Sequence, residues 1–273
     1  MKRLKTQLDD LRDLFERSLT VRCVSEPLAS FDNSTHTEIV RGFMEHRDFD
    51  VVGVREHGQV IGYVERNTIG GIDERPIGRF ARSFDRNDSI LADTAPFREL
   101  FDHLNEKPRV FVWVAGRVGG IAMRGDLQKT PVRMWLFSLV SLIEMHLLAL
   151  VREYHVGGSW QKLLPQENLK NANRYFAVNC RANEAMRLED CLSLGDKFEI
   201  VVGSPALRKA LMIGSVSKAD EFFKQLIKLR DRLAHSQDIL HDSRFQLFDL
   251  VNESENLLER CERATGNLCE VNE

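Results

Sequence analysis

The sequence predicts a chain of two parts: an α+β N-terminal region made of two similar units, followed by an all-α helical bundle. Two observations lead to this prediction. A stretch of the first half recurs 58 positions later, and beyond Pro131 the apolar residues follow helical spacing alone. The length of 273 residues is sufficient for two separate hydrophobic cores.

An amphipathic helix is expected at residues 1–19, because apolar residues form one stripe there at helical spacing. These residues are Leu4, Leu8, Leu11, Phe15 and Leu19. The repeat follows in residues 20–130. Residues 58–64 (GQVIGYV) align without a gap with residues 116–122 (GRVGGIA), and 38–43 align with 96–101. Each copy is expected to contain a helix, a strand, a tight glycine-bearing turn and a second strand. The polar, arginine-rich residues 73–88 are expected to link the copies.

The repeat resembles a tandem pair of cystathionine-β-synthase-type (CBS) domains, in which two β-α-β-β-α units pack together and often bind adenosine nucleotides. The family signature is Gly, an apolar residue, any residue, Ser or Thr, two further residues and Asp. In the second copy Gly120 and Asp126 match it, while Met123 replaces the hydroxyl residue. In the first copy Thr68 replaces the acid and Glu65 stands at the hydroxyl position. The resemblance implies a site for AMP, ADP or ATP formed by Gly120, Met123, Asp126 and Thr68, with Asp126 accepting hydrogen bonds from the ribose.

The same residues also have an interpretation that needs no ligand. Gly120 would end a strand and Asp126 would cap the following helix, since Asp is a good N-cap residue. Because only the second copy keeps the acid, at most one intact nucleotide site is expected. The resemblance to paired CBS domains also implies a homodimer.

Five helices are expected in residues 131–265, followed by a tail at 266–273. Their ranges are Val132–Glu153, Pro165–Leu194, Pro205–Met212, Ser217–His235 and Ser243–Ala264. Residues 217–220 (SKAD) are expected to form a capping box, with Asp in place of Glu. Short connections between these helices favour an antiparallel bundle. Within the first helix, residues 134–151 are mostly apolar, but this segment carries Glu144 and His146 and is short for a bilayer, which favours a buried helix and no membrane partner.

The fourth helix carries Arg230, Asp231 and His235 near its end. Arginine neutralises phosphates and histidine moves protons near neutral pH, so the pair suggests chemistry on a phosphodiester. The apolar stripe of this helix is expected at Phe222, Leu226, Leu229 and Leu233. At about 100° per residue, Arg230 falls near the stripe and His235 almost opposite it. The two can meet only if the helix distorts near Ala234 or a second subunit completes the site, whereas Asp231 and His235 share a face and could pair.

Arg-x4-His late in a helical bundle resembles the motif of HEPN domains, which are helical bundles that dimerise and include many metal-independent ribonucleases. The resemblance implies that the 2′-hydroxyl of RNA attacks the adjacent phosphodiester. Arg230 would stabilise the phosphate charge, His235 would act as acid or base, and Asp231 would orient His235 or hold Arg230. No metal and no catalytic cofactor are implied. The alternative is a solvated face of mixed charge, since basic residues near a helix C-terminus are favoured by the helix dipole.

Composition limits the partners that can be expected. A net charge of -3 gives no overall attraction to RNA, so RNA binding would need a local basic patch. Five scattered cysteines without a Cys-x-x-Cys pair predict neither disulfides nor a zinc site. Residues 1–6 lack an apolar signal segment, and a reduced cytoplasm is the expected setting.

The function expected from these features is that of a nucleotide-regulated ribonuclease. The CBS pair would sense an adenosine nucleotide, and a dimeric HEPN domain would cleave RNA. The alternative is a non-catalytic regulatory or scaffold protein that binds nucleotides.

Overall fold

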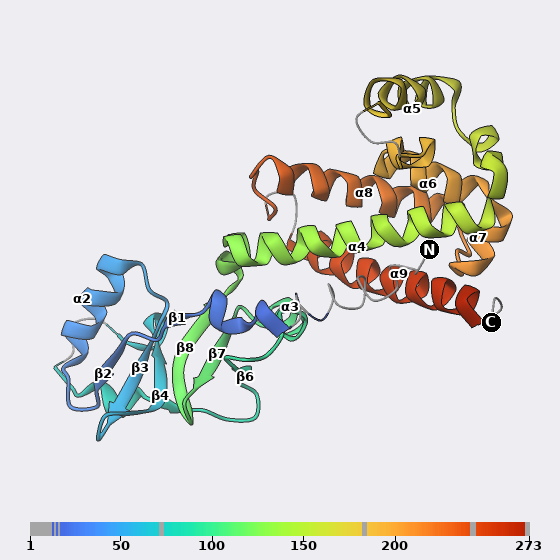
Figure 1. Cartoon of the computed structure of the whole chain (residues 1–273). Helices are drawn as coiled ribbons and strands as arrows, with labels where there is room; N and C mark the ends of the chain where they lie inside the picture. The colour runs from blue at the N-terminus through green and yellow to red at the C-terminus, as the bar shows by residue number, and fades with distance from the viewer. Residues whose placement is uncertain are drawn as a thin grey trace. The chain divides into compact units, whose positions relative to one another are not determined.

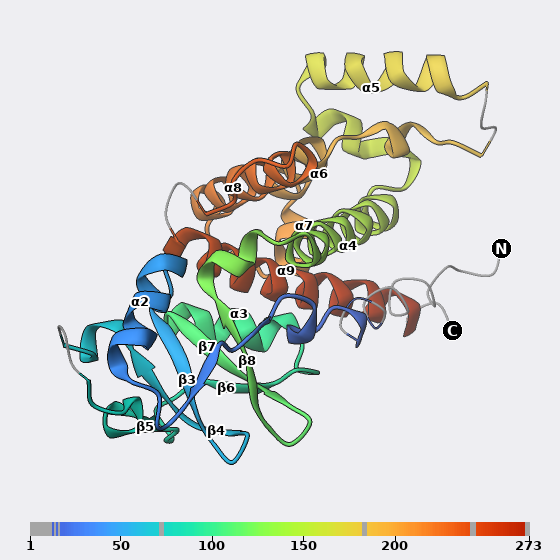
Figure 2. The same cartoon turned by 90° about the vertical axis from the view of Figure 1, so that its left-hand side faces the viewer.

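The computed structural model describes residues 13, 15, 17–70, 74–181, 185–240 and 244–270, without the side chains of 244–246 and 267–270. Contacts divide the chain into an N-terminal unit, Asp13–Val132, and a helical unit that contains Arg133–Glu273. Strands occur in the first and helices alone in the second (Figures 1 and 2). The mixed α+β first half and the helical second half agree with the predicted fold class. Most of the helix expected at residues 1–19 lies outside the described residues.

The N-terminal unit contains two β-hairpins, each preceded by a helix. In the first copy, α2 (Thr37–Arg47) leads into β3 (Val51–Glu56) and β4 (Gln59–Glu65). In the second, α3 (Phe97–Glu106) leads into β7 (Arg109–Val114) and β8 (Arg117–Met123). Short strands and 3-10 turns complete the unit: η1 (Val21–Cys23), β1 (Glu26–Pro27), β2 (Ser30–Asp32), η2 (Arg66–Thr68), η3 (Ile77–Phe80), β5 (Arg82–Ser83), β6 (Ile90–Ala92) and η4 (Arg124–Gln128).

Both hairpins turn at the same two positions of the repeat. His57 and Gly58 have φ angles of 48° and 76°, and their equivalents Ala115 and Gly116 have 48° and 86°. Two consecutive residues in the left-handed region are what a two-residue type I′ turn requires, and glycine adopts this conformation without a steric cost. The glycine-bearing turns expected from the repeat are therefore present in both copies.

The offset of 58 positions holds through the hairpins but not through the helices. α2 and α3 begin at Thr37 and Phe97, 60 positions apart, so the alignment of residues 38–43 with 96–101 is wrong by two. The reason lies in how each helix ends. α2 ends in a left-handed cap at Asp48, with φ 53°, whereas Lys107 after α3 is extended. The first copy has one more residue in its helix and one more in the connection to its strand, which together give the shift of two.

The two copies exchange a short strand, which joins them into one unit. The sheets have the orders β2-β3-β4-β5 and β1-β8-β7-β6. Thus β5, which precedes the second copy, pairs with β4 of the first, and β1, which precedes the first copy, pairs with β8 of the second. Each exchanged strand passes over a glycine: a Cβ on Gly62 would collide with the carbonyl oxygen of Arg82, and one on Gly120 would lie 3.2 Å from that of Glu26.

The second α-helix expected in each copy is absent from the described residues, which corrects the β-α-β-β-α prediction. β4 and β8 are followed instead by the 3-10 turns η2 and η4. In the first copy Gly70 and Gly71 follow, and consecutive glycines are poor helix formers. The segment 73–88, expected as a linker, contains η3 and β5 and so belongs to the fold.

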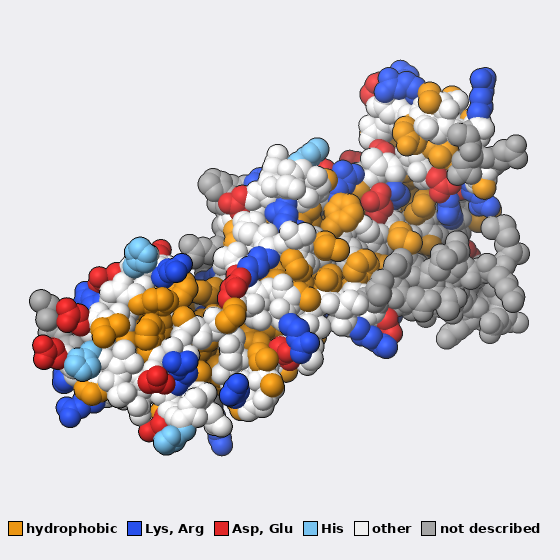
Figure 3. All heavy atoms as spheres, turned by 60° about the vertical axis from the view of Figure 1, so that its left-hand side comes forward, with side chains coloured by type: hydrophobic (Ala, Val, Ile, Leu, Met, Phe, Trp, Pro, Cys, Tyr) orange, Lys and Arg blue, Asp and Glu red, His pale blue; other side chains and the backbone are white. Residues whose placement is uncertain are grey.

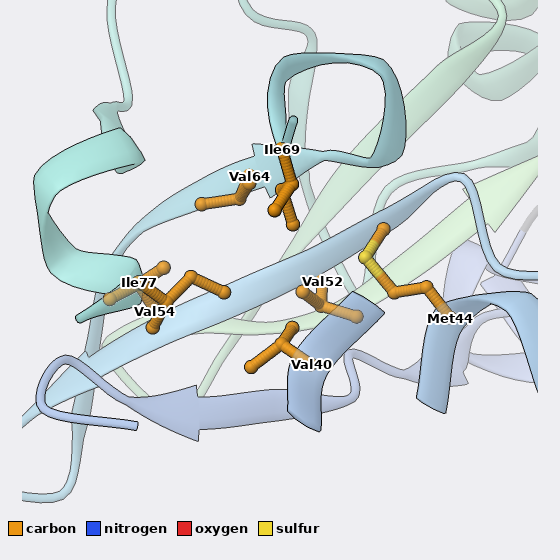
Figure 4. Close-up of a cluster of buried hydrophobic side chains, with 7 residues drawn as sticks. All are labelled: Val40, Met44, Val52, Val54, Val64, Ile69 and Ile77. Carbon is orange, nitrogen blue, oxygen red and sulfur yellow. The ribbon is translucent and has the colours of Figure 1, made fainter. Parts of the chain in front are cut away.

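The core of the first copy lies between α2, its hairpin and η3. Seven side chains form it, each at most 2% exposed: Val40, Met44, Val52, Val54, Val64, Ile69 and Ile77 (Figure 4). A second cluster includes Val51 and Tyr63 of the first copy with Phe111 and Ile121 of the second. Hydrophobic burial therefore holds the two copies together as well as each copy by itself.

The helical unit is built on two long helices, α4 (Thr130–Tyr154) and α9 (Arg244–Glu270). The remaining elements are η5 (Val156–Leu163), α5 (Gln166–Asn179), η6 (Leu188–Cys191), α6 (Leu194–Gly203), α7 (Pro205–Ala210) and α8 (Val216–Ala234). The helix expected at Pro165–Leu194 was too long, since α5 ends at Asn179 and a separate helix, α6, begins at Leu194. α9 continues through Glu270, beyond the expected start of the tail at 266.

Two helix starts are explained by serine caps. Ser193 accepts the backbone N–H of Asp196 at 3.1 Å, and the Asp196 carboxylate accepts that of Ser193, which forms a capping box at the start of α6. The cap of α8 is Ser215, whose hydroxyl accepts from the backbone of Lys218. The predicted capping box at Ser217 is therefore two residues too late.

α4 is long and apolar enough to span a membrane, since its most apolar 18 residues have a mean hydropathy of 1.9. However, 61% of this 18-residue stretch is buried within the structure. Such burial is typical of a core helix. The acid in its middle has a structural partner, because Lys197 of α6 donates to Glu144 at 2.7 Å and to the carbonyl of Leu192 at 2.7 Å. Lys197 is only 3% exposed, so this pair satisfies a buried ammonium.

Candidate functional site

A cavity of about 520 Å³ opens in the N-terminal unit beside β1, the start of β3 and η4. Apolar side chains form part of its wall, among them Leu28, Phe49, Ile121 and Met123. Its volume is within the usual range for small-molecule sites. The predicted site residues Met123 and Asp126 both line it.

Asp126 has two internal partners. One carboxylate oxygen accepts the backbone N–H of Met123 at 2.7 Å, which caps η4, and the other lies 2.9 Å from Nζ of Lys129. Asp126 thus caps η4 from the third position of the turn, with Met123 and not Asp126 as the N-cap residue. A carboxylate has about four lone-pair positions, so these contacts leave capacity for a ligand. The side chain is 16% exposed and lines the cavity.

Lys129 connects Asp126 to the segment before β1. Its ammonium donates to the carbonyl oxygen of Val24 at 2.6 Å and forms a short ion pair with Glu26. Burial disfavours the charge of Lys129, but the hydrogen bonds to Glu26 and Asp126 outweigh it and raise its pKa. The lysine therefore stays protonated beside the cavity.

The cavity is lined by more acids than the cations beside it neutralise. Glu26, Asp48, Asp50 and Asp126 all line it. Arg66 lies 3.1 Å from Asp48 and 2.6 Å from Asp50, while Lys129 serves Glu26 and Asp126. Four carboxylates with two cations leave a local excess of negative charge, which repels highly charged anions.

The other two predicted nucleotide-binding residues lie elsewhere. Gly120 is buried in β8 opposite Pro27 of β1, where glycine leaves room for the exchanged strand. Thr68 is exposed in η2 and donates to the carbonyl oxygen of Glu65 at 2.7 Å. Neither lines the cavity. Sequence reasoning missed Lys129 and Arg66; the signal for Lys129 was its spacing of three residues from Asp126.

The predicted catalytic residues lie at the C-terminal end of α8. Nη1 of Arg230 donates to Oδ1 of Asp231 at 2.8 Å, and their side chains are 37% and 53% exposed. His235 is the exposed C-cap of the helix. Its backbone N–H donates to the carbonyl of Asp231, but no described residue forms a hydrogen bond or ion pair with its imidazole. In the described chain, Asp231 does not form the pair with His235 that their spacing allows, and Arg230 does not contact His235, as expected for a regular helix.

The apolar stripe of α8 differs by one residue from the expected one. Phe223, at 4% exposure, is its buried aromatic, whereas Phe222 is only half-buried. The reason is a ring stack: Phe223 lies parallel to Phe198 of α6 at a centroid distance of 3.9 Å. Arg230 is half-buried at the edge of the stripe, as the helix geometry predicted.

The surface has charges of both signs. On the face drawn in Figure 3, basic and acidic side chains are interspersed, and hydrophobic side chains gather between them on the N-terminal unit. Among the described residues, no three His, Cys, Asp or Glu side chains are grouped as a metal site would need.

No protein-family model and no curated protein matches this sequence. The N-terminal part is similar to solved structures of CBS-domain pairs. A CBS domain-containing protein from Bacillus anthracis str. Ames Ancestor has 13% identity and a TM-score of 0.37, covering 42% of this chain and 94% of its own. CBSX2 in complex with AMP has 17% identity and a TM-score of 0.34, and the match covers 40% of this chain and 92% of that structure. The CBS domain of a bacterial CNNM/CorC family Mg²⁺ transporter in complex with ATP has 11% identity and a TM-score of 0.35, and the match covers 48% of this chain and 97% of that structure.

Proposed function

We propose that the N-terminal unit is a regulatory module that binds an adenosine nucleotide in the cavity beside Asp126. The observation that carries the proposal is the carboxylate of Asp126, which lines a partly apolar cavity of about 520 Å³. Phe49 and Ile121 give the wall apolar surface for a purine, and an ionised carboxylate is a strong acceptor for two ribose hydroxyls.

The charges around the cavity set the number of phosphates that it tolerates. Among the described residues, Lys129 and Arg66 are the cations that pair with the acids of the cavity wall, and each already pairs with two carboxylates. A triphosphate brings more negative charge towards four acids than a monophosphate does. AMP is therefore expected to bind more tightly than ATP.

Calorimetric titration with AMP and ATP tests this proposal. Asp126→Asn keeps an acceptor for the Met123 N–H but loses the charge, and it should weaken AMP binding about tenfold or more. Thr68→Val is the matched control, because Thr68 occupies the equivalent position of the first copy outside the cavity. Equal AMP binding by the wild type and Asp126→Asn would rule out this site.

We further propose that the helical unit is a metal-independent ribonuclease whose site is completed by a second subunit. The observation that favours it is the accessibility of Arg230, Asp231 and His235 at one helix end, with an imidazole that has no partner among the described residues. Because Arg230 bonds to Asp231 and not to His235, one chain does not assemble the pair. Arg230 of one chain would act with His235 of the partner subunit.

The reaction would be an internal transesterification of RNA. The 2′-oxygen bonds to phosphorus as the bond to the 5′-oxygen of the next nucleotide breaks, which leaves a 2′,3′-cyclic phosphate. His235 accepts the proton of the 2′-hydroxyl and then gives this proton to the leaving 5′-oxygen. Arg230 offsets the charge that develops on the phosphate. No redox change and no water are required.

Cleavage of labelled RNA in the presence of EDTA tests the second proposal. His235→Ala and Arg230→Ala should each abolish cleavage, and Lys224→Ala, a remote exposed cation of α8, should not. Mixing the two inactive variants should restore part of the activity, because a mixed dimer contains one intact Arg230–His235 pair. Cleavage that persists in His235→Ala would refute the ribonuclease assignment, and unrestored activity in the mixture would refute the shared site.

A further inference from the structure

The end of α8 is a six-residue turn that contains His235. Ser236 adopts the left-handed region, with φ 54°. The backbone N–H of Gln237 donates to the carbonyl of Arg232 at 2.9 Å, and that of Ser236 to the carbonyl of Leu233. This is the Schellman arrangement, in which a left-handed residue reverses the chain after the last helical turn. The position of His235 therefore depends on how firmly residues 232–237 are held.

Arg133, in the first turns of α4, holds both ends of this turn. Its Nη2 donates to the carbonyl of Arg232 at 2.9 Å, and its Nη1 donates to the carbonyl of Gln237 at 2.8 Å. One planar guanidinium thus spans the first and the last residue of the turn. Lysine could not reproduce this contact, since an ammonium is a single point of charge without the fixed fork of arginine. A cation also suits the negative end of the dipole of α8.

The turn has a second attachment that does not involve Arg133. Ile239, two residues beyond Gln237, is 5% exposed and anchors the outgoing chain. Loss of Arg133 is therefore expected to loosen residues 232–237 without releasing the segment from the unit.

We infer that Arg133 is a positioning residue that holds the His235-bearing turn of α8 in place for catalysis. The functional half of this inference rests on the proposed ribonuclease activity. The structural half, that Arg133 orders the turn, rests only on the two hydrogen bonds to Arg232 and Gln237.

Hydrogen exchange of the Gln237 amide in the full-length protein tests the structural half. Arg133→Ala should speed this exchange about tenfold, because two charge-assisted hydrogen bonds to the turn are lost. The exchange rate of the Gln237 amide in Arg133→Lys should lie between those of Arg133→Ala and the wild type. The matched control is Arg263→Lys, which alters an arginine that donates to the helix carbonyl of Glu259 at 3.3 Å on α9. Unchanged Gln237 exchange in Arg133→Ala would overturn the inference.

RNA cleavage by the same variants tests the functional half. Arg133→Ala should lower kcat about tenfold and leave KM nearly unchanged, because the catalytic histidine is displaced while Arg230, which precedes the turn, is not. A kcat equal to that of the wild type would overturn the positioning role. If the wild type itself does not cleave RNA, the ribonuclease proposal and the catalytic role of Arg133 fail together, and the exchange result still decides whether Arg133 orders the turn.

Discussion

The ammonium of Lys129 lies 2.9 Å from the carboxylate of Asp126 and 2.6 Å from the carbonyl oxygen of Val24. One side chain therefore ties the wall of the cavity to the segment that leads into the exchanged strand β1. This contact has consequences for stability that do not depend on any ligand.

Replacing Lys129 with methionine should destabilise the N-terminal unit by about 2 kcal/mol, since hydrogen bonds to a charged donor are lost and Asp126 is left without its cation. Urea denaturation measures the change. Lys224→Met is the control, because Lys224 pairs with Asp220 on the surface with 74% of its side chain exposed. Loss of Lys224 should change the free energy of unfolding far less than loss of Lys129, because exposed ion pairs contribute little to stability. Equal losses for the two variants would argue against a structural role for Lys129.

The glycines beneath the exchanged strands should respond unequally to alanine. Gly62→Ala should lower the free energy of unfolding by about 3 kcal/mol, because its Cβ would meet the backbone of Arg82. Gly120→Ala should cost about 1 kcal/mol, as its nearest contacts are 3.2 Å. Gly42, on α2 with open space around it, should instead gain about 0.5 to 1 kcal/mol as alanine. Urea denaturation of the three variants measures these changes. An unchanged free energy of unfolding in Gly62→Ala would contradict the pairing of β4 with β5.

The buried Lys197–Glu144 pair should be asymmetric to mutation. Glu144→Gln leaves an ammonium that is 3% exposed without its counter-charge, and should cost about 3 kcal/mol of the free energy of unfolding. Lys197→Met should cost less, since the Glu144 side chain is 32% exposed and can be solvated. Asp220→Asn breaks an exposed pair of the same kind and serves as control. Thermal unfolding measures these losses. A larger loss of stability in Lys197→Met than in Glu144→Gln would contradict the burial of Lys197.

His155 should make the fold sensitive to acid. Its ring nitrogens lie 3.1 Å from the hydroxyl of Ser159 and 3.0 Å from that of Ser204. Burial lowers the pKa of His155. The unfolded chain then binds a proton more readily than the folded one, so this stabilisation is present above about pH 6.5 and is lost as pH falls through the lowered pKa.

The corresponding measurement compares melting temperatures at about pH 7.5 and about pH 5. Between these pH values the melting temperature of His155→Gln should fall less than that of the wild type. The melting temperature of His46→Gln, a change at an exposed position of α2, should fall as much as that of the wild type. A wild-type drop in both variants would mean that His155 does not carry the effect.

Local patterns predicted the hairpins well, because a glycine-bearing turn between alternating strands is encoded within a few residues. The repeat alone predicts turns at Gly58 and Gly116, and both residues have positive φ angles. The exchanged strands β1 and β5 are only two residues long. Segments so short carry no periodicity, and their pairing is decided by contacts far away in sequence.

Helix boundaries and side-chain partners were less predictable for the same reason. The choice between Phe222 and Phe223 as the buried ring depends on Phe198 of another helix, which periodicity in α8 does not reveal. The motif predicts Asp126 as a candidate site residue, but it does not identify Lys129 as the partner of Asp126. The Arg133 contact joins residues about one hundred positions apart, which no local pattern could indicate.

The exchange of β1 and β5 makes the smallest foldable piece of this region larger than the repeat suggests. A fragment with only the first copy would lack the strand that covers Gly62, and its β4 would be an open sheet edge. It would also carry β1 without the hairpin on which β1 pairs. In two such fragments, the unpaired β1 of one could pair with the open β4 edge of the other, because β1 and β5 pair at equivalent positions of the two hairpins. Separate expression of one copy is therefore expected to give strand-swapped dimers or aggregates, and the duplication satisfies within one chain what would otherwise require two molecules.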